Sequence, residues 1–193
     1  PVVESAFDRP LDVEYLINLM LKWNDAKGND FAGTIDPQRI GMSGHSFGGY
    51  TSFYEGFEDD RIKAILPMAP ATQQLAVFGY KLEEFPVPTM VMAGGADKTL
   101  ETDKEMTVAY EKLPPPKYYF ELMTAGHYSF TDICSLNLKQ LADDIGFGDA
   151  EDALEDGCGP ENVDVDFAHP LIRQFGIGFL NVHLRDSACS KVY

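Results

Sequence analysis

The run Gly44-His45-Ser46-Phe47-Gly48 constrains the fold of this chain more than any other feature. The spacing G-x-S-x-G is typical of a sharp turn between a strand and a helix, which exposes the serine hydroxyl at the bend. Residues 39–43 before the run resemble a short buried strand, and residues 50–57 after it can form a helix. The surroundings of the motif therefore predict strand, tight turn and helix, with Ser46 at the turn.

Further apolar segments alternate with segments of helical period along the chain. The expected strands are residues 39–43, 62–67, 88–93 and 117–123. The expected helices are residues 50–57, about 102–113, about 169–184 and a first helix that Asp8 caps, with Pro10 in its first turn and apolar positions from Val13 to Leu21. Strands separated by helices form a parallel sheet with right-handed crossovers. The predicted class is α/β, a parallel sheet flanked by helices, in one domain over residues 1–193.

Two polar residues directly follow later predicted strands. Asp97 comes after residues 88–93, and His127 comes after residues 117–123. Because the carboxyl ends of parallel strands meet at one edge of a sheet, we expect both side chains near Ser46. A serine hydroxyl becomes a good nucleophile when a base takes its proton, so we predict Ser46 as nucleophile, His127 as base and Asp97 as the acid that orients the base.

Several rivals to these assignments remain open. Glu101 and Asp103 are alternative acids, although they lie in the next predicted helix, where carboxylates are usually solvated. His169 is an alternative base at the start of the last predicted helix, and His183 on that helix is expected to be structural. A glycine-rich turn with an incidental serine is a further interpretation, but it leaves the ordered acid and base unexplained.

The motif also predicts how negative charge and substrate are held. The backbone N–H of Phe47 is expected to donate to the oxyanion that forms on the substrate, and its ring to help wall the pocket for the acyl group. Gly44 and Gly48 allow the backbone and the helix to pack closely at the bend. His45 is expected to line the pocket or to pack nearby, because alternation along the strand directs it away from Ser46.

Composition excludes two classes of function. The chain has 31 acidic and 15 basic side chains and a formal net charge of −16, which would repel nucleic acid and anionic lipid. No window approaches the roughly 18 apolar residues of a membrane span, so none is expected. The three cysteines show no zinc-ligand spacing, and we expect neither a metal nor a cofactor.

An acidic segment covers about residues 143–166, with ten carboxylates and no Lys or Arg. We expect a solvated surface excursion that forms a flap over the active site. Cys134 and Cys158 bracket much of the segment, and a disulfide between them would pin it. A calcium site is the alternative, because the segment supplies hard oxygen ligands, but no known loop spacing is present. Its candidate ligands are Asp149, Glu151, Asp152, Asp164 and Asp166.

Four stretches of this sequence resemble the α/β-hydrolase superfamily, and within it the dienelactone-hydrolase-like and platelet-activating-factor-acetylhydrolase-like serine esterases. They are residues 36–41, 44–49, 94–97 and 126–130, followed by Asp132 and Cys134. The resemblance implies hydrolysis of carboxylic esters through an acyl-enzyme, without a cofactor, by Ser46, Asp97 and His127. It also places Phe130 at the substrate pocket. Secreted lipases and polyester hydrolases look similar over the same motifs, which implies an extracellular or periplasmic protein.

The resemblance also implies that part of the fold is absent. The family sheet has about eight strands and its nucleophile follows the fifth, whereas one predicted helix precedes residues 39–43 here. We therefore expect the C-terminal part of an α/β-hydrolase with an open apolar edge, completed by an N-terminal half or by a complementing chain. The competing hypothesis is a noncatalytic domain of this fold, or an inactive fragment that requires that complement.

Overall fold

The computed structural model describes residues 2–136 and 155–187. Its strands are β1 (Ile40–His45), β2 (Ile62–Met68), β3 (Thr89–Gly94) and β4 (Lys117–Leu122). All neighbouring pairs are parallel, and the sheet order β1-β2-β3-β4 follows the chain. The parallel sheet confirms the predicted α/β class, and β1, which leads into the serine motif, lies at one edge of the sheet.

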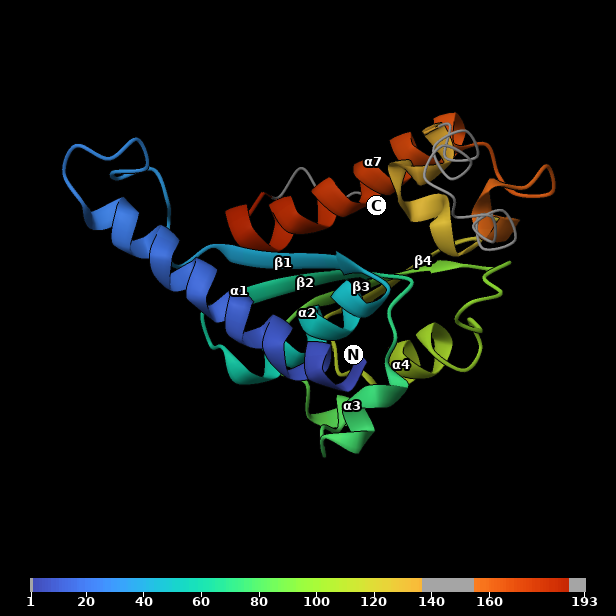
Figure 1. Cartoon of the computed structure of the whole chain (residues 1–193), viewed down its shortest axis with the longest axis horizontal. Coiled ribbons are helices and arrows are strands. Elements are labelled where there is room, and N and C mark those ends of the chain that lie inside the picture. The colour runs from blue at the N-terminus through green and yellow to red at the C-terminus, as the bar shows by residue number, and fades with distance from the viewer. Residues whose placement is uncertain (1, 137–154, 188–193) are drawn as a thin grey trace.

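Helices cover both faces of this sheet (Figure 1). The α-helices are α1 (Val2–Asp25), α2 (Phe47–Glu58), α3 (Gln73–Val77), α4 (Met106–Lys112) and α7 (Val165–Arg185), and the short 3-10 helices are η1 (Leu82–Glu84), η2 (His127–Phe130) and η3 (Asp132–Ser135). In Figure 1, α7 lies on one face of the sheet, and α1, α2 and α4 lie on the other. Among the described residues, no helix combines the length and the apolar character that a membrane crossing requires.

The core lies around the two central strands. Every residue of β3 is buried, as are five of the seven residues of β2. Tyr50 and Phe53 of α2 are fully buried on one face, and Ile172 and Phe179 of α7 are buried on the other. Removing these side chains from water supplies the main driving force for folding. The edge strands β1 and β4 are only partly buried.

Three predicted helix boundaries were wrong. Helix α1 begins at Val2 and contains Pro10 in its interior, because Ala6 packs in the core and continues the buried face before the proline. Helix α4 is shorter than predicted, since residues 98–105 form turns before it. Helix α7 begins earlier, at Val165, where the Asp164 side chain accepts a hydrogen bond from the N–H of Asp166; His169 therefore lies inside the helix and does not cap it.

Glu55 of α2 is a buried carboxyl group, with 3% of its surface exposed. Burial, followed by the nearby Asp59, Glu14 and Glu58 carboxylates, raises the pKa of Glu55 from 4.5 to about 7, against a smaller opposing effect of Arg61. The native state therefore holds a proton at this site that the unfolded chain releases near its ordinary pKa. The contribution of protonated Glu55 to the free energy of unfolding is fully present below about pH 4.5 and is lost as the pH rises through 7.

Replacing Glu55 with glutamine should flatten this pH dependence. We expect Glu55→Gln to match the wild type near pH 4.5 and to exceed its free energy of unfolding by roughly 2 kcal/mol at pH 8, because the amide carries no charge to desolvate. Urea unfolding at both pH values measures the difference. The exposed Glu111 gives the control Glu111→Gln. Equal pH dependence in both variants would contradict this account of Glu55.

Candidate active site

Ser46 lies at the turn between β1 and α2, with φ of 56° and ψ of −117°. Positive φ is unfavourable for a residue with a Cβ, and such strain is concentrated at functional sites. Surrounding hydrogen bonds hold the conformation: the Ser46 N–H donates to the carbonyl of Met68 at 2.9 Å, and its carbonyl accepts from the N–H groups of Gly49 and Ala71 at 2.9 and 3.2 Å. The partly exposed serine thus sits on a sharp bend at the carboxyl end of β1.

Close backbone packing explains the glycines around Ser46. A Cβ on Gly44 would lie 2.3 Å from the carbonyl carbon of Gly48, and one on Gly49 would lie 2.6 Å from the Cβ of Pro70. A Cβ on Gly48 would meet nothing within 4 Å. The approach of β1 to α2 therefore depends on Gly44, and the approach of α2 to Pro70, after β2, depends on Gly49; neither depends on a side chain being absent at Gly48.

This difference gives a matched pair of substitutions. We expect Gly44→Ala to lower the free energy of unfolding by about 1–3 kcal/mol, because the new methyl group must push backbone atoms apart. Gly48→Ala should change it by less than about 1 kcal/mol, since the added methyl group meets open space. Urea denaturation of both variants checks the prediction, which fails if the two are equally destabilised.

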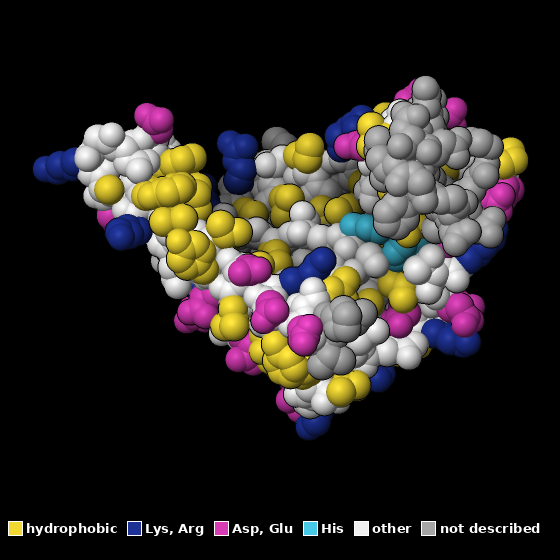
Figure 2. Space-filling model, viewed as in Figure 1, with side chains coloured by type: hydrophobic (Ala, Val, Ile, Leu, Met, Phe, Trp, Pro, Cys, Tyr) yellow, Lys and Arg dark blue, Asp and Glu magenta, His cyan; other side chains and the backbone are white. Residues whose placement is uncertain are grey.

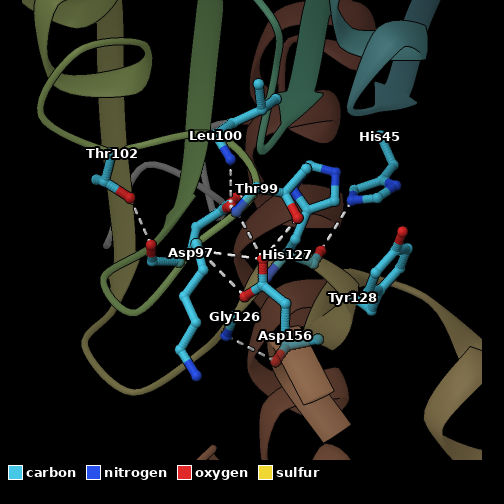
Figure 3. A network of polar contacts seen from close by, with 12 residues as sticks. His45, Asp97, Thr99, Leu100, Thr102, Gly126, His127, Tyr128 and Asp156 are labelled. Atoms are coloured by element: carbon cyan, nitrogen blue, oxygen red, sulfur yellow. Dashed lines mark hydrogen bonds and ion pairs between the residues drawn. The ribbon is translucent and has the colours of Figure 1, made fainter. Parts of the chain in front are cut away.

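Asp97 and His127 form a buried pair at the carboxyl ends of β3 and β4, the same end of the sheet as Ser46 (Figure 3). Asp97 Oδ2 lies 2.8 Å from His127 Nδ1, and the two residues are 8% and 2% exposed. The second oxygen, Oδ1, accepts the N–H groups of Thr99 and Leu100 at 2.9 and 2.7 Å. A carboxylate can only accept, so Nδ1 carries the proton of this bond and a neutral ring leaves Nε2 as a base.

The alternative acids and the alternative base do not contact the Asp97–His127 pair in the contacts described below. Glu101 is exposed and pairs with Lys104 at 2.6 Å, and Asp103 is exposed as well. His169 lies within α7, where its Nδ1 is 3.8 Å from Asp132 Oδ1. His183 contacts the hydroxyl of Tyr118 through Nε2 at 3.2 Å. The structure therefore joins Asp97 to His127 and leaves the rival groups outside this pair.

His45 connects the serine motif to the turn that carries His127. Its Nε2 donates a hydrogen bond to the carbonyl of His127 at 2.8 Å, and the two ring centroids are 4.5 Å apart. Burial, and next the proximity of His127, lowers the pKa of His45 to about 4. His45 is therefore neutral at neutral pH. Because Ser46 follows His45 directly, this contact brings β1 and η2 together beside the serine.

The remaining predicted pocket residues are Phe47 and Phe130. As the first residue of α2, Phe47 has an N–H without an intrahelical acceptor, which is the property that an oxyanion donor needs. Its ring stacks on Tyr50 with centroids 4.9 Å apart, under the guanidinium of Arg9. Phe130 is 8% exposed, and the centroid of its ring lies 6.5 Å from that of the His45 ring. Histidine side chains reach the surface within a hollow of the face in Figure 2.

Part of the acidic segment contributes to this region in a way that the sequence did not indicate. Asp156 is 6% exposed and accepts the N–H of His127 at 3.1 Å, so the predicted solvated surface excursion does not hold at Asp156. Cys134 and Cys158 form a disulfide with an S–S distance of 2.02 Å. Residues 143–154 of the predicted flap lie outside the described residues.

The calcium alternative receives no support from the described part of the segment. Asp149, Glu151 and Asp152 lie outside the described residues, and Asp164 caps α7. Within residues 2–136 and 155–187, no group of three or more His, Cys, Asp or Glu side chains is arranged to hold a metal ion.

The family model for PET hydrolase-like proteins matches residues 5–142. The chain belongs to the PET hydrolase-like family. This PET hydrolase-like chain is 31% identical to Lipase 1 of Moraxella sp. (strain TA144) over 94 residues, which are 49% of the chain and 28% of the lipase.

A solved structure supports the same fold. The ferulic acid esterase from Streptomyces cinnamoneus superposes with a TM-score of 0.67 at 19% identity, over 95% of the PET hydrolase-like chain and 50% of the esterase. The likeness confirms the predicted α/β-hydrolase fold. The chain spans about half the length of the esterase, and its match covers less than a third of the lipase.

Proposed function

We propose that this chain is the catalytic part of a serine carboxylic ester hydrolase. The observation that carries the proposal is the buried pair of Asp97 Oδ2 and His127 Nδ1, 2.8 Å apart. The pair lies at the end of the sheet where the strands finish and where the strained turn holds Ser46. Membership of the PET hydrolase-like family and likeness to a lipase and a ferulic acid esterase support an ester as the substrate. A hydroxyl, a neutral imidazole and a buried carboxylate are the groups that acyl transfer needs.

In the proposed reaction, Ser46 Oγ attacks the ester carbonyl carbon while His127 Nε2 takes the hydroxyl proton. The tetrahedral oxyanion accepts a hydrogen bond from the N–H of Phe47 at the start of α2. His127 then gives its proton to the departing alcohol, which leaves an acyl group on Ser46. Water attacks this acyl-enzyme while His127 takes one of its protons; His127 then returns that proton to Ser46 Oγ as the bond between the acyl carbon and Oγ breaks, and the carboxylic acid is released. Throughout, the Asp97 carboxylate accepts a hydrogen bond from the Nδ1–H of His127 and stabilises the imidazolium without taking its proton.

The substrates that we propose are uncharged esters: aliphatic or aromatic small esters, lipid esters or a polyester. The formal net charge of −16 disfavours an anionic lipid surface. The Cys134–Cys158 disulfide supports an oxidising compartment, and we propose an extracellular or periplasmic location for the protein.

Hydrolysis of p-nitrophenyl acetate tests the proposed function. The purified chain should release p-nitrophenolate with saturation kinetics, and the same concentration of urea-unfolded chain should not exceed the background rate. A folded chain that hydrolyses no faster than its unfolded control would favour the noncatalytic or incomplete fragment.

We also propose that further strands of the α/β-hydrolase sheet pair with β1. Among the described residues β1 pairs with β2 alone, so its outer edge presents unpaired backbone groups. A groove of about 510 Å³ beside this edge is lined by α1 and β1, and includes Leu16, Ile17 and Ile40. Apolar side chains of α1 remain exposed, with Leu11 and Tyr15 both at 64%. Hydrophobic side chains (yellow) gather over α1 on the face shown in Figure 2. The 50% coverage of the esterase is consistent with additional strands at this edge.

Intact mass and N-terminal sequencing of the protein from its source test this second proposal. Either residues before Pro1 or a co-purifying chain should supply the strands, and the amide protons of β1 should exchange more slowly in that protein than in the isolated chain. Full activity of the isolated chain, with equal exchange of the β1 amides in both forms, would overturn it.

A further inference from the structure

The carboxylate of Asp156 joins the two loops that hold Asp97 and His127. Its Oδ1 accepts the N–H of His127 at 3.1 Å, and its Oδ2 accepts both the N–H and the hydroxyl of Thr99 at 2.7 Å. The N–H of Lys98 donates to both oxygens, at 3.1 and 3.0 Å. Figure 3 shows Asp156 close to Asp97 and His127. One buried side chain thus contacts the loop after β3 and the turn after β4.

All of these partners donate, so the site requires an acceptor. Burial alone would raise the pKa of Asp156, but the hydroxyl of Thr99 and the N–H groups of His127, Lys98 and Thr99 outweigh it and hold the pKa below its usual value. The carboxylate is therefore ionised at neutral pH, and both oxygens accept. An amide would turn one end of the side chain into a donor that faces other donors.

The backbone around Asp156 is shaped for this approach. A Cβ on Gly126, the residue before His127, would lie 2.6 Å from Asp156 Oδ1 and 2.5 Å from the nitrogen of Gly157. Gly157 itself has φ of +125°, in the region that favours glycine. The two glycines allow the segment of Asp156 to lie directly against the turn of His127.

Other contacts anchor this segment independently of the carboxylate. The Cys134–Cys158 disulfide ties it to η3. The Ser129 hydroxyl donates to the carbonyl of Gly157 at 3.2 Å, and Asn162 Oδ1 accepts the N–H of Gly157 at 3.1 Å. These contacts hold the segment of Asp156 in place, while its carboxylate contacts the loops that carry Asp97 and His127.

We propose that Asp156 is a positioning residue, which fixes Asp97 and His127 relative to each other for the ester hydrolysis proposed above. Asp97 and His127 lie 30 residues apart on separate loops, and the Nδ1–Oδ2 bond alone joins their side chains. Asp156 holds the backbone of His127 directly and the loop of Asp97 through Thr99 and Lys98. Since small misplacements of reacting groups cost large factors in rate, this anchor acts on the chemical step and leaves substrate binding unaffected.

Three variants test the proposal. Asp156→Asn should lower kcat for p-nitrophenyl acetate by about 10- to 100-fold and change KM by less than about twofold. Thr99→Val, which removes one hydroxyl bond to Asp156, should lower kcat by a few-fold without unfolding the protein. Glu161→Gln is the matched control: Glu161 is exposed on the same segment and pairs with the side chain of the same Lys98, at 3.2 Å, so its activity should match the wild type.

A spectroscopic readout separates positioning from folding and from the proposed activity. In proton NMR, the His127 Nδ1 proton should give a downfield resonance in the wild type and in Glu161→Gln, and this resonance should broaden or vanish in Asp156→Asn and weaken in Thr99→Val. If no protein hydrolyses the ester, the proposed function fails while the resonance still tests Asp156. The proposal is overturned if folded Asp156→Asn has the wild-type kcat and an unchanged His127 resonance. If Asp156→Asn does not fold, the same two results in Thr99→Val would overturn it.

Discussion

Replacing Ser46 with alanine is expected to lower kcat for p-nitrophenyl acetate by at least about 10⁴-fold. In the proposed reaction the variant lacks the oxygen that bonds to the acyl group, and losses of this size follow removal of the nucleophile from a serine triad. Serine and alanine both carry a Cβ, so alanine at position 46 should adopt the positive φ of 56° as serine does, and the conformation of the turn should be unchanged. Initial rates over a range of ester concentrations, together with circular dichroism of both proteins, provide the measurement.

Ser43 supplies the control for this substitution. It lies three residues earlier, on β1, and is exposed, so Ser43→Ala removes a serine hydroxyl from the strand that leads into the turn. Its kcat should stay within about twofold of the wild type. An active Ser46→Ala variant, or an equal loss in both variants, would mean that Ser46 is not the nucleophile.

Replacing Asp97 with asparagine is expected to lower kcat by about 10⁴-fold with little change in KM. Asp97 accepts three hydrogen bonds, from His127 Nδ1 and from the N–H groups of Thr99 and Leu100. Asparagine has one accepting oxygen, so its NH₂ group must face either the backbone donors or the imidazole. If it faces the imidazole, it favours the tautomer with the proton on Nε2, and this tautomer cannot take the proton of Ser46.

The alternative acids serve as controls for Asp97. Glu101→Gln and Asp103→Asn alter exposed carboxylates a few residues further along, and Glu101 already pairs with Lys104. Both variants should keep kcat within about twofold of the wild type. A loss in either one that equals the loss in Asp97→Asn would transfer the role of the acid to that residue.

The two central strands could be predicted from the sequence because each is a short apolar run bounded by breakers. Residues 62–67 were predicted and β2 covers Ile62–Met68; residues 88–93 were predicted and β3 covers Thr89–Gly94. Both are central in the sheet and buried on both faces, which requires the continuous apolar pattern that the sequence displays. The pairing of Asp97 with His127 followed from the same rule, since each residue comes directly after a parallel strand.

Asp156 could not be predicted, and the reason is physical. The composition of its segment, with ten carboxylates and no basic residue, is typical of solvated chain. Its burial depends on donors that are distant in sequence, among them Thr99 and His127, which lie 57 and 29 residues away. Local composition carries no signal of such long-range contacts. Gly126 and Gly157 permit the close packing, but a glycine in the sequence does not by itself indicate which segment will pack against it.

The early start of α1 has a similar origin. Pro10 at the first turn of a helix is a sound prediction from local preferences, since proline lacks the N–H that an interior position uses. Tertiary packing overrides this preference here. Ala6 is buried, and Phe7 packs edge-to-face on Phe78 with centroids 5.2 Å apart, so the turns before the proline are held by contacts with the rest of the fold.

Covalent labelling measures whether Ser46 is the activated nucleophile of this chain. The native chain is incubated with a fluorophosphonate, digested, and mapped by peptide mass spectrometry, with Ser46→Ala and urea-unfolded protein as controls. We predict one phosphonate per chain, on Ser46, and none in either control. A folded native chain that stays unlabelled, or carries the adduct on another residue, would contradict the account.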